Sequence, residues 1–167
     1  MISAGQPLPP GKLMESTAFD DSTGCPLGPK EVDIAATTKD KKVVIFGLPG
    51  AYTPTCSAKH VPSYVQNAAA LKAKGVDEVW CVTTNDAFVM AAWGKHLNVD
   101  GKVRMLADGS AQYVKELGLD LDLTARGMGV RSNRYAMIVD HGVVKGVYVE
   151  APGKYEVSSA EAVLSQL

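Results

Sequence analysis

The sequence is poor in cysteine and has no long apolar run. Only three cysteines occur in 167 residues, at positions 25, 56 and 81. An odd number without paired spacing does not indicate a secreted disulfide framework. No stretch approaches the roughly 20 apolar residues of a membrane span, and the N-terminus lacks the charged and apolar regions of a signal peptide. We therefore expect a cytoplasmic protein with mostly reduced thiols and no membrane partner.

An excess of charge of one sign is also missing. The 17 Lys and Arg residues nearly balance 18 Asp and Glu residues, for a formal net charge of −1. Without a basic stripe, the composition gives no indication of nucleic-acid binding. The chain has no cluster of metal-ligand type, no glycine-rich phosphate loop after a strand and no Cys-x-x-Cys pair. We therefore expect no metal and no bound organic cofactor.

The remaining composition is that of an ordinary globular protein. Hydrophobic residues make up 46% of the chain and charged residues 21%, both common values for a folded domain. The length suits one domain over residues 1–167. A chain of this size buries a sizeable core without disulfide bonds.

Hydrophobic periodicity predicts alternating strands and helices. Residues 1–30 are rich in Gly and Pro and predict extended segments and turns, with room for a small hairpin. The continuous apolar run Val43–Leu48 is typical of a buried central strand. The period then becomes helical from Pro54 to about Lys74, with Pro62 inside the helix expected to kink it.

Later segments continue the alternation. In chain order they are a strand over Glu78–Thr83, a helix capped by Asn85 or Asp86, a short strand in "KVRMLAD", a helix stopping at Gly118, a hairpin turning at Gly142, and a last helix opened by the capping box Ser158-x-x-Glu161. This order predicts an α/β fold: a mixed sheet with helices on both faces and a closing antiparallel pair. The thioredoxin fold is one layout with that ending.

One short stretch combines residues suited to thiol chemistry. In "PGAYTPTCSAKH" (49–60), Cys56 lies where a strand ends and a helix begins. If Thr53 caps the helix, the free N–H groups and the helix dipole favour the Cys56 thiolate. The Thr53 hydroxyl is placed to bond the sulfur, and His60 lies one turn along on the same face. From these residues alone, an inert buried cysteine remains about equally open.

The exact residues resemble a known family. Pro49, Thr53 and Cys56 spell P-x-x-x-T-x-x-C, which resembles the active-site motif of the peroxiredoxins. The resemblance to their type II branch, also called the peroxiredoxin-five group, covers nearly the whole chain through "VVIFGLPGAYTPTCSAKHVPSY", "KGVDEVWCVTTNDAFVMAAWG", "KVRMLAD" and "RYAMIVDHGVVKGVYVE". It implies a thioredoxin fold, commonly in a homodimer. It also implies a thiol peroxidase for hydrogen peroxide and organic hydroperoxides, acting in antioxidant defence and redox homeostasis.

The resemblance also implies roles for single residues. Cys56 would be the peroxidatic cysteine, which attacks the O–O bond and becomes sulfenic acid. Thr53 would hold the peroxide and the thiolate, and Pro49 would shield the site from water. The family's arginine, just before the aromatic residue of the hairpin's first strand, would be Arg134, with Arg131 as the nearest competitor. An arginine stays charged at working pH and donates two bonds at once.

His60 and the thiol that resolves the sulfenic acid stay open at this point. The type II branch has a histidine four residues after the cysteine, so His60 either orients the site or only packs. Cys81, 25 residues after Cys56, is proposed to resolve in some plant-like members. Its position on a strand face favours a core cysteine instead.

Ser158 holds the position where other type II members have a C-terminal resolving cysteine, and nothing brings Cys25 to Cys56. We therefore expect a one-cysteine cycle reduced by glutathione with glutaredoxin, in preference to thioredoxin.

Two rival functions are a cysteine hydrolase using Cys56 and His60, which lacks an identifiable third residue, and a redox-inert binding module.

Overall fold

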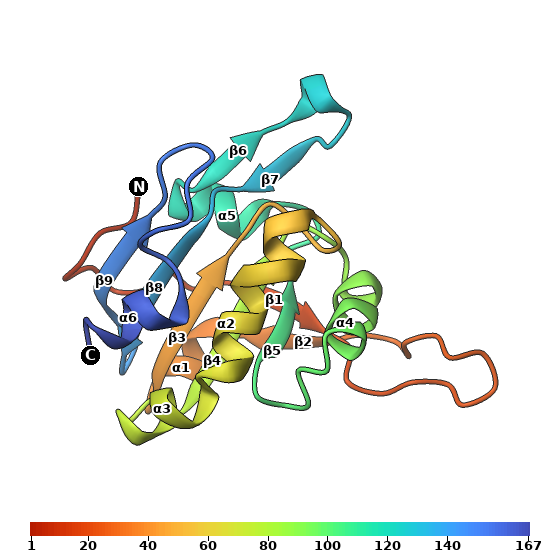
Figure 1. Ribbon diagram of the computed structural model, residues 1–167, viewed down its shortest axis with the longest axis horizontal. Helices are drawn as coiled ribbons and strands as arrows, with labels where there is room; N and C mark the ends of the chain where they lie inside the picture. Colours follow the sequence, from red (N-terminus) through yellow and green to blue (C-terminus); the bar gives the residue numbers. More distant parts are fainter.

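A seven-stranded mixed sheet forms the centre of the molecule (Figure 1), and the computed structural model describes residues 1–167. In spatial order the strands are β2 (Lys30–Asp33), β1 (Lys12–Glu15), β5 (Arg104–Ala107), β4 (Glu78–Thr83), β3 (Lys42–Gly47), β8 (Tyr135–Asp140) and β9 (Val143–Val149). Strands β3, β4 and β5 are parallel, whereas β8 is antiparallel to β3 and forms a hairpin with β9. The partly parallel sheet and its closing antiparallel pair agree with the sequence-based prediction.

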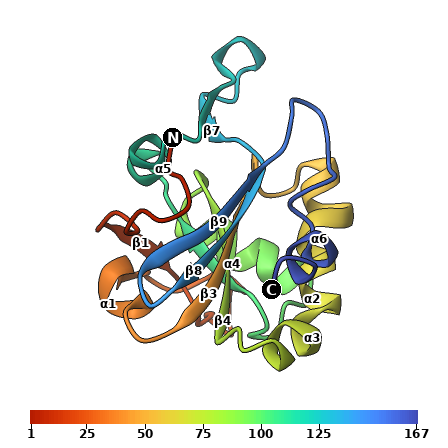
Figure 2. The same ribbon diagram turned by 90° about the vertical axis from the view of Figure 1, so that its left-hand side faces the viewer.

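Helices cover both faces of this sheet. They are α1 (Ile34–Thr38), α2 (Val61–Gln66), α3 (Ala68–Ala73), α4 (Ala87–His96), α5 (Gln112–Leu117) and α6 (Ala160–Leu164). Figure 2 shows α1 and α5 on one side of the sheet, and α2, α3 and α6 on the other. Each face has its own cluster of buried apolar side chains, of 21 and 19 residues. Because both faces are buried, the central strands are apolar over most of their length, as their sequence indicates.

Several predicted boundaries are confirmed. The strand predicted over Glu78–Thr83 is β4, with the same bounds, and α5 ends at Gly118, which has a left-handed φ of 70°. The hairpin turns at His141 and Gly142, with φ values of 50° and 77°. A two-residue turn of type I′ requires a positive φ at both of its central residues, and its twist matches that of the two paired strands.

The long helix after β3 differs from the prediction. It opens at Pro54, and residues Cys56–His60 then form one wide π-helical turn, η1, in which the Val61 N–H donates to the Cys56 carbonyl. A proline has no N–H to donate, and its ring clashes with the carbonyl four residues earlier. The wide turn accommodates Pro62 at the start of α2. The helix is then interrupted at Asn67, which lies between α2 and α3.

The capping box predicted for the last helix, Ser158 with Glu161, does not form. Ser159, not Ser158, is the N-cap of α6, and its hydroxyl accepts a hydrogen bond from the Ala162 N–H. Ser158 is fully buried and bonds elsewhere. Of the two N-cap candidates for α4, Asp86 caps the helix, whereas Asn85 accepts a hydrogen bond from the loop before Cys56.

Some short elements had no clear signal in the sequence. They are α1, a hairpin of β6 (Asp120–Asp122) with β7 (Val130–Ser132), and a single 3₁₀ turn, η2 (Thr124–Arg126), at its tip. The hairpin projects from the body of the molecule (Figure 1). None of the helices has the length and apolar character needed to cross a membrane.

Candidate active site

Cys56 lies at the start of the helix that follows the central strand β3, with its side chain fully buried. The loop before it is tied at three points. The Ala51 N–H donates to Asn85 Oδ1 at 2.8 Å, the Thr53 hydroxyl to the Gly50 carbonyl at 2.7 Å, and Arg131 Nη1 to the Pro49 carbonyl at 3.1 Å. These bonds fix the path of the backbone that leads to the thiol.

Arg134 reaches the sulfur from another part of the chain. Its Nη2 donates to Cys56 Sγ at 3.3 Å. Tyr135 pairs with Gly47 at the last position of β3, so the preceding Arg134 lies just beyond the strand, next to the helix start. Strand register thus explains how a residue 78 positions away in the chain meets the thiol. Arg131, the competing candidate, binds the Pro49 carbonyl instead.

His60 is fully buried between two partners that fix its tautomer. Its Nδ1 lies 3.0 Å from Arg134 Nη1, and its Nε2 lies 3.0 Å from the Ser158 carbonyl. A guanidinium only donates and a carbonyl only accepts, so Nδ1 is the acceptor and Nε2 carries the proton. Burial, reinforced by the charge of Arg134, lowers the pKa of His60 to about 3. The imidazole is therefore neutral at ordinary pH.

The Thr53 hydroxyl is not bonded to the sulfur. It donates its proton to the Gly50 carbonyl instead. Its oxygen keeps lone pairs that accept a hydrogen bond. Thr53 can thus act as an acceptor for an O–H group.

The other two cysteines differ from Cys56 and from each other. Cys81 is fully buried in β4, on the same face of the sheet as Cys56, as its alternation predicts. Burial, and next the neighbouring Cys56, raise the pKa of the Cys81 thiol well above its ordinary value. Cys25 is exposed in the N-terminal loop, and all three thiols are free.

The C-terminal segment adds residues that the sequence did not single out. The Glu150 carboxylate accepts hydrogen bonds from the backbone N–H groups of Glu156, Val157 and Ser158 and from the Ser158 hydroxyl, at 2.7–3.0 Å. Burial alone would raise the pKa of Glu150, but these bonds lower it overall. The Tyr155 ring packs edge-on against His60, with ring centroids 5.3 Å apart. No pattern in the sequence marks Glu150 or Tyr155, because their contacts depend on a loop that folds back over the site.

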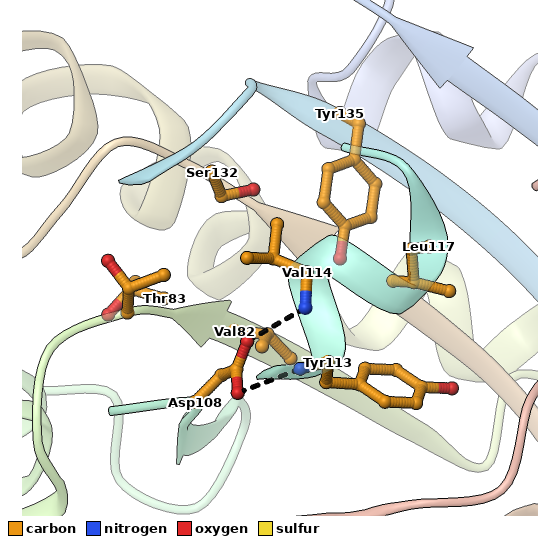
Figure 3. Close-up of a pocket in the computed structure, with 9 residues that line it drawn as sticks. Val82, Thr83, Asp108, Tyr113, Val114, Leu117, Ser132 and Tyr135 are labelled. Atoms are coloured by element: carbon orange, nitrogen blue, oxygen red, sulfur yellow. Dashed lines mark hydrogen bonds between the residues drawn. The ribbon is translucent and has the colours of Figure 1, made fainter. Parts of the chain in front are cut away.

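A hollow lies on the side of the sheet opposite Cys56, beside Tyr135 (Figure 3). The Asp108 carboxylate there accepts hydrogen bonds from the N–H groups of Tyr113 and Val114, at 3.1 and 2.8 Å, and so holds the first turn of α5. The hollow is too narrow to admit a water molecule. It therefore has a structural role and offers no room for a ligand.

Comparison with known proteins agrees with this arrangement. The redoxin family model matches residues 3–164. Peroxiredoxin-2B of Arabidopsis thaliana is 43% identical over 166 residues, covering 99% of this chain and 98% of that protein. The chain belongs to the redoxin family, in its peroxiredoxin group. It is thus a thiol peroxidase that uses a peroxidatic cysteine in antioxidant defence.

Two crystal structures extend the similarity to the fold. Reduced Prx3 from Vibrio vulnificus in complex with hydrogen peroxide has a TM-score of 0.90 and 46% identity, over 99% of both chains. A protein from Burkholderia cenocepacia that bears the name of a thioredoxin reductase has a TM-score of 0.93 and 58% identity, over 100% of this chain and 98% of that one. The expected thioredoxin-like fold is confirmed.

Proposed function

We propose that Cys56 is the peroxidatic cysteine of this peroxidase, and that Arg134, Thr53 and Pro49 assist it. The observation that carries the proposal is the 3.3 Å contact between Arg134 Nη2 and the Cys56 sulfur. A fixed positive charge at this distance stabilises a thiolate, which is the reactive form. Neither Cys81 nor Cys25 has such a partner among its hydrogen bonds.

The first step is a two-electron transfer from sulfur to oxygen. The Cys56 thiolate attacks one oxygen of the peroxide, an S–O bond forms and the O–O bond breaks. The electron pair of that bond leaves with the distal oxygen, which takes up a proton and departs as water or an alcohol. Sulfur is oxidised to sulfenic acid and the peroxide is reduced. Arg134 N–H groups stabilise the charge that moves onto the oxygens.

Thr53 and Pro49 shape the space in which this occurs. The Thr53 oxygen, whose proton is engaged by Gly50, accepts a hydrogen bond from the peroxide O–H and holds this terminal oxygen, the one that is attacked, beside the sulfur. Pro49, whose carbonyl is held by Arg131, covers the loop side of the site and limits the access of water.

A peroxide-consumption assay tests the assignment of Cys56. Cys56→Ser should abolish consumption of hydrogen peroxide and of an organic hydroperoxide, whereas Cys25→Ser, at an exposed thiol outside the site, should retain it. Retained turnover in Cys56→Ser with fresh reductant would show that another residue reacts. A cysteine hydrolase would fail the same assay in its parent form.

For the reducing half of the cycle, we propose a one-cysteine mechanism with glutathione and glutaredoxin, in preference to thioredoxin. The sulfenic acid would condense with one glutathione thiol, releasing water and leaving a mixed disulfide. A second thiol, from glutaredoxin or another glutathione, would then attack the glutathione sulfur. A new disulfide forms between these two sulfurs, the mixed disulfide breaks, and Cys56 leaves as the thiolate. Support comes from Ser158 at the position of a C-terminal resolving thiol and from the buried position of Cys81. Comparing the two reductants in steady-state turnover tests this preference.

We further propose that residues 1–167 act as one domain, in a cytoplasmic homodimer. The resemblance to the type II branch supports the dimer, and the sparse, unpaired cysteines support a reducing compartment. Light scattering on the reduced protein tests the dimer, and localisation of a tagged chain tests the compartment.

A further inference from the structure

A closed circuit of hydrogen bonds begins and ends on Arg134. Its side chain donates from Nη1 to His60 Nδ1 at 3.0 Å, and His60 Nε2 donates to the Ser158 carbonyl at 3.0 Å. The Ser158 N–H and hydroxyl donate to Glu150 Oε2 at 3.0 and 2.7 Å. The Glu150 N–H returns to the Arg134 carbonyl at 2.9 Å. The circuit therefore joins the arginine to the C-terminal loop through a histidine that makes no hydrogen bond to the sulfur.

The circuit matters because an arginine side chain has many possible orientations. Its guanidinium carries five N–H donors on a flexible stem, and the Tyr155 ring and solvent compete for them. The Arg134 Cζ lies 5.9 Å from the Tyr155 ring centroid. With Nη1 bonded to His60, the planar group is turned so that Nη2 meets Cys56 Sγ. A single acceptor thus selects the productive orientation.

We infer that His60 is a positioning residue that aims Arg134 at the sulfur. The C-terminal loop, which Glu150 folds, offers the Ser158 carbonyl to the His60 Nε2–H, and the Nδ1 lone pair of His60 is thereby left free to accept from Arg134. This inference rests on the proposed role of Cys56. The groups that face His60 are Arg134, Tyr64, Tyr155 and, through the loop, Glu150. Because the imidazole is neutral, its Nδ1 lone pair stays available throughout the ordinary pH range.

Two substitutions at position 60 separate an acceptor from mere packing. In His60→Asn, the side-chain amide oxygen takes the place of Nδ1 and still accepts from Arg134. In His60→Leu, a side chain of similar bulk offers no acceptor. The rate of Cys56 oxidation by peroxide, followed by stopped flow, should stay close to that of the parent in His60→Asn. It should fall about 100-fold in His60→Leu, as expected for a misplaced catalytic group.

A second readout reports on the Arg134 contact itself. The pH dependence of Cys56 alkylation by iodoacetamide should shift upward by about one pH unit in His60→Leu, because the thiolate loses an aligned positive partner. The profile should not shift in His60→Asn. A residue that only packs would change thermal stability in both variants without moving this profile.

A matched control and a second variant complete the design. The Tyr64 hydroxyl donates to the same Ser158 carbonyl at 2.7 Å but makes no bond to Arg134. Tyr64→Phe should therefore cost stability and leave the alkylation profile in place. If His60→Leu does not fold, Glu150→Gln, which removes the charge that gathers the loop N–H groups, should give the same upward shift in a smaller degree.

The inference is overturned if His60→Asn and His60→Leu oxidise at equal rates, or if neither shifts the alkylation profile. Those results would leave Cys56 as the reacting residue. Failure of the proposed function is a separate outcome, because it would be seen as peroxide consumption by Cys56→Ser.

Discussion

Arg134 brings two donors to two different acceptors, the sulfur of Cys56 and the Nδ1 of His60. At the scale of single residues, this pairing explains why arginine and not lysine suits the position. A lysine offers one point charge on a flexible stem, whereas the planar fork fixes the direction of both bonds. Thr53 follows the same logic, because donation to Gly50 leaves its oxygen to accept.

Removing the guanidinium should separate the two arginines near the loop. We expect Arg134→Met to slow Cys56 oxidation by about 100-fold, because one lost transition-state donor typically costs that much. Arg131→Met should cost far less, since Arg131 binds only backbone carbonyls, those of Met128 and Pro49. Stopped-flow oxidation of both variants checks this, and the reverse ranking would mean that the catalytic arginine is misassigned.

The Thr53 hydroxyl is best tested by a change that preserves shape. Thr53→Val removes one partly buried hydrogen bond, worth about 1 kcal/mol in folding, but also the oxygen proposed to hold the peroxide, and a misplaced reactant can cost about 100-fold in rate. We therefore predict a loss of peroxidase rate far larger than the loss of thermal stability. Measuring both on one preparation checks the prediction, and an unchanged rate would exclude the hydroxyl from the mechanism.

At the scale of elements, patterns local in sequence predicted more than contacts distant in sequence. The apolar run of β3, the alternation around Cys81 and the hairpin turn at Gly142 each carry their signal within a few residues. The short α1 and the β6–β7 hairpin carry too few periodic residues to be recognised. The Glu150 loop and the role of Ser158 depend on tertiary folding, which one sequence does not reveal.

The pairing of β3 with β8 makes one glycine critical. A Cβ at Gly47 would lie 2.2 Å from the Cε1 of Tyr135, whose ring crosses it. Gly47→Ala should therefore force the strands to shift and lower the free energy of unfolding by about 1–3 kcal/mol. Gly28→Ala is a matched control, because nothing lies within 4 Å of its added carbon. Denaturant unfolding checks both, and equal stabilities would contradict the strand geometry.

At the scale of the whole molecule, the buried neutral His60 links stability to pH. Its pKa falls from an ordinary value of 6.5 to about 3 on folding. Between these values, the unfolded chain binds a proton that the folded chain does not. The contribution of His60 to the free energy of unfolding is therefore complete above about pH 6.5. It is lost as the pH falls toward 3, by about 1.4 kcal/mol per pH unit.

Unfolding measured across this range should show the slope directly. His60→Asn should flatten the acid slope by about one proton's contribution, whatever its effect on absolute stability. Identical slopes in parent and variant would show that His60 does not remain neutral in the folded protein.

The reducing step is also a property of the whole chain, because it depends on how far the helix start must open. Cys81→Ser should still turn over with glutathione and glutaredoxin, since Cys81 is fully buried in a strand. Peroxide followed by glutathione should add one glutathione per chain on Cys56, seen by intact mass. Rapid loss of two hydrogens, with Cys56 and Cys81 linked in one peptide pair, would instead show that the helix unwinds and Cys81 resolves.

The wide π turn at Cys56–His60 makes the site depend on the length of the chain as well as on its residues. Such a turn holds one residue more than an α-helical turn closed by the bond to the fourth residue back. Deleting one residue from 57–59 would let the helix close regularly, at about 100° of rotation per residue. Cys56, Thr53 and Pro49 would keep their spacing in the motif, yet the sulfur would swing around the helix axis away from Arg134. A sequence can thus retain the entire motif and lose the site through one missing residue beyond it.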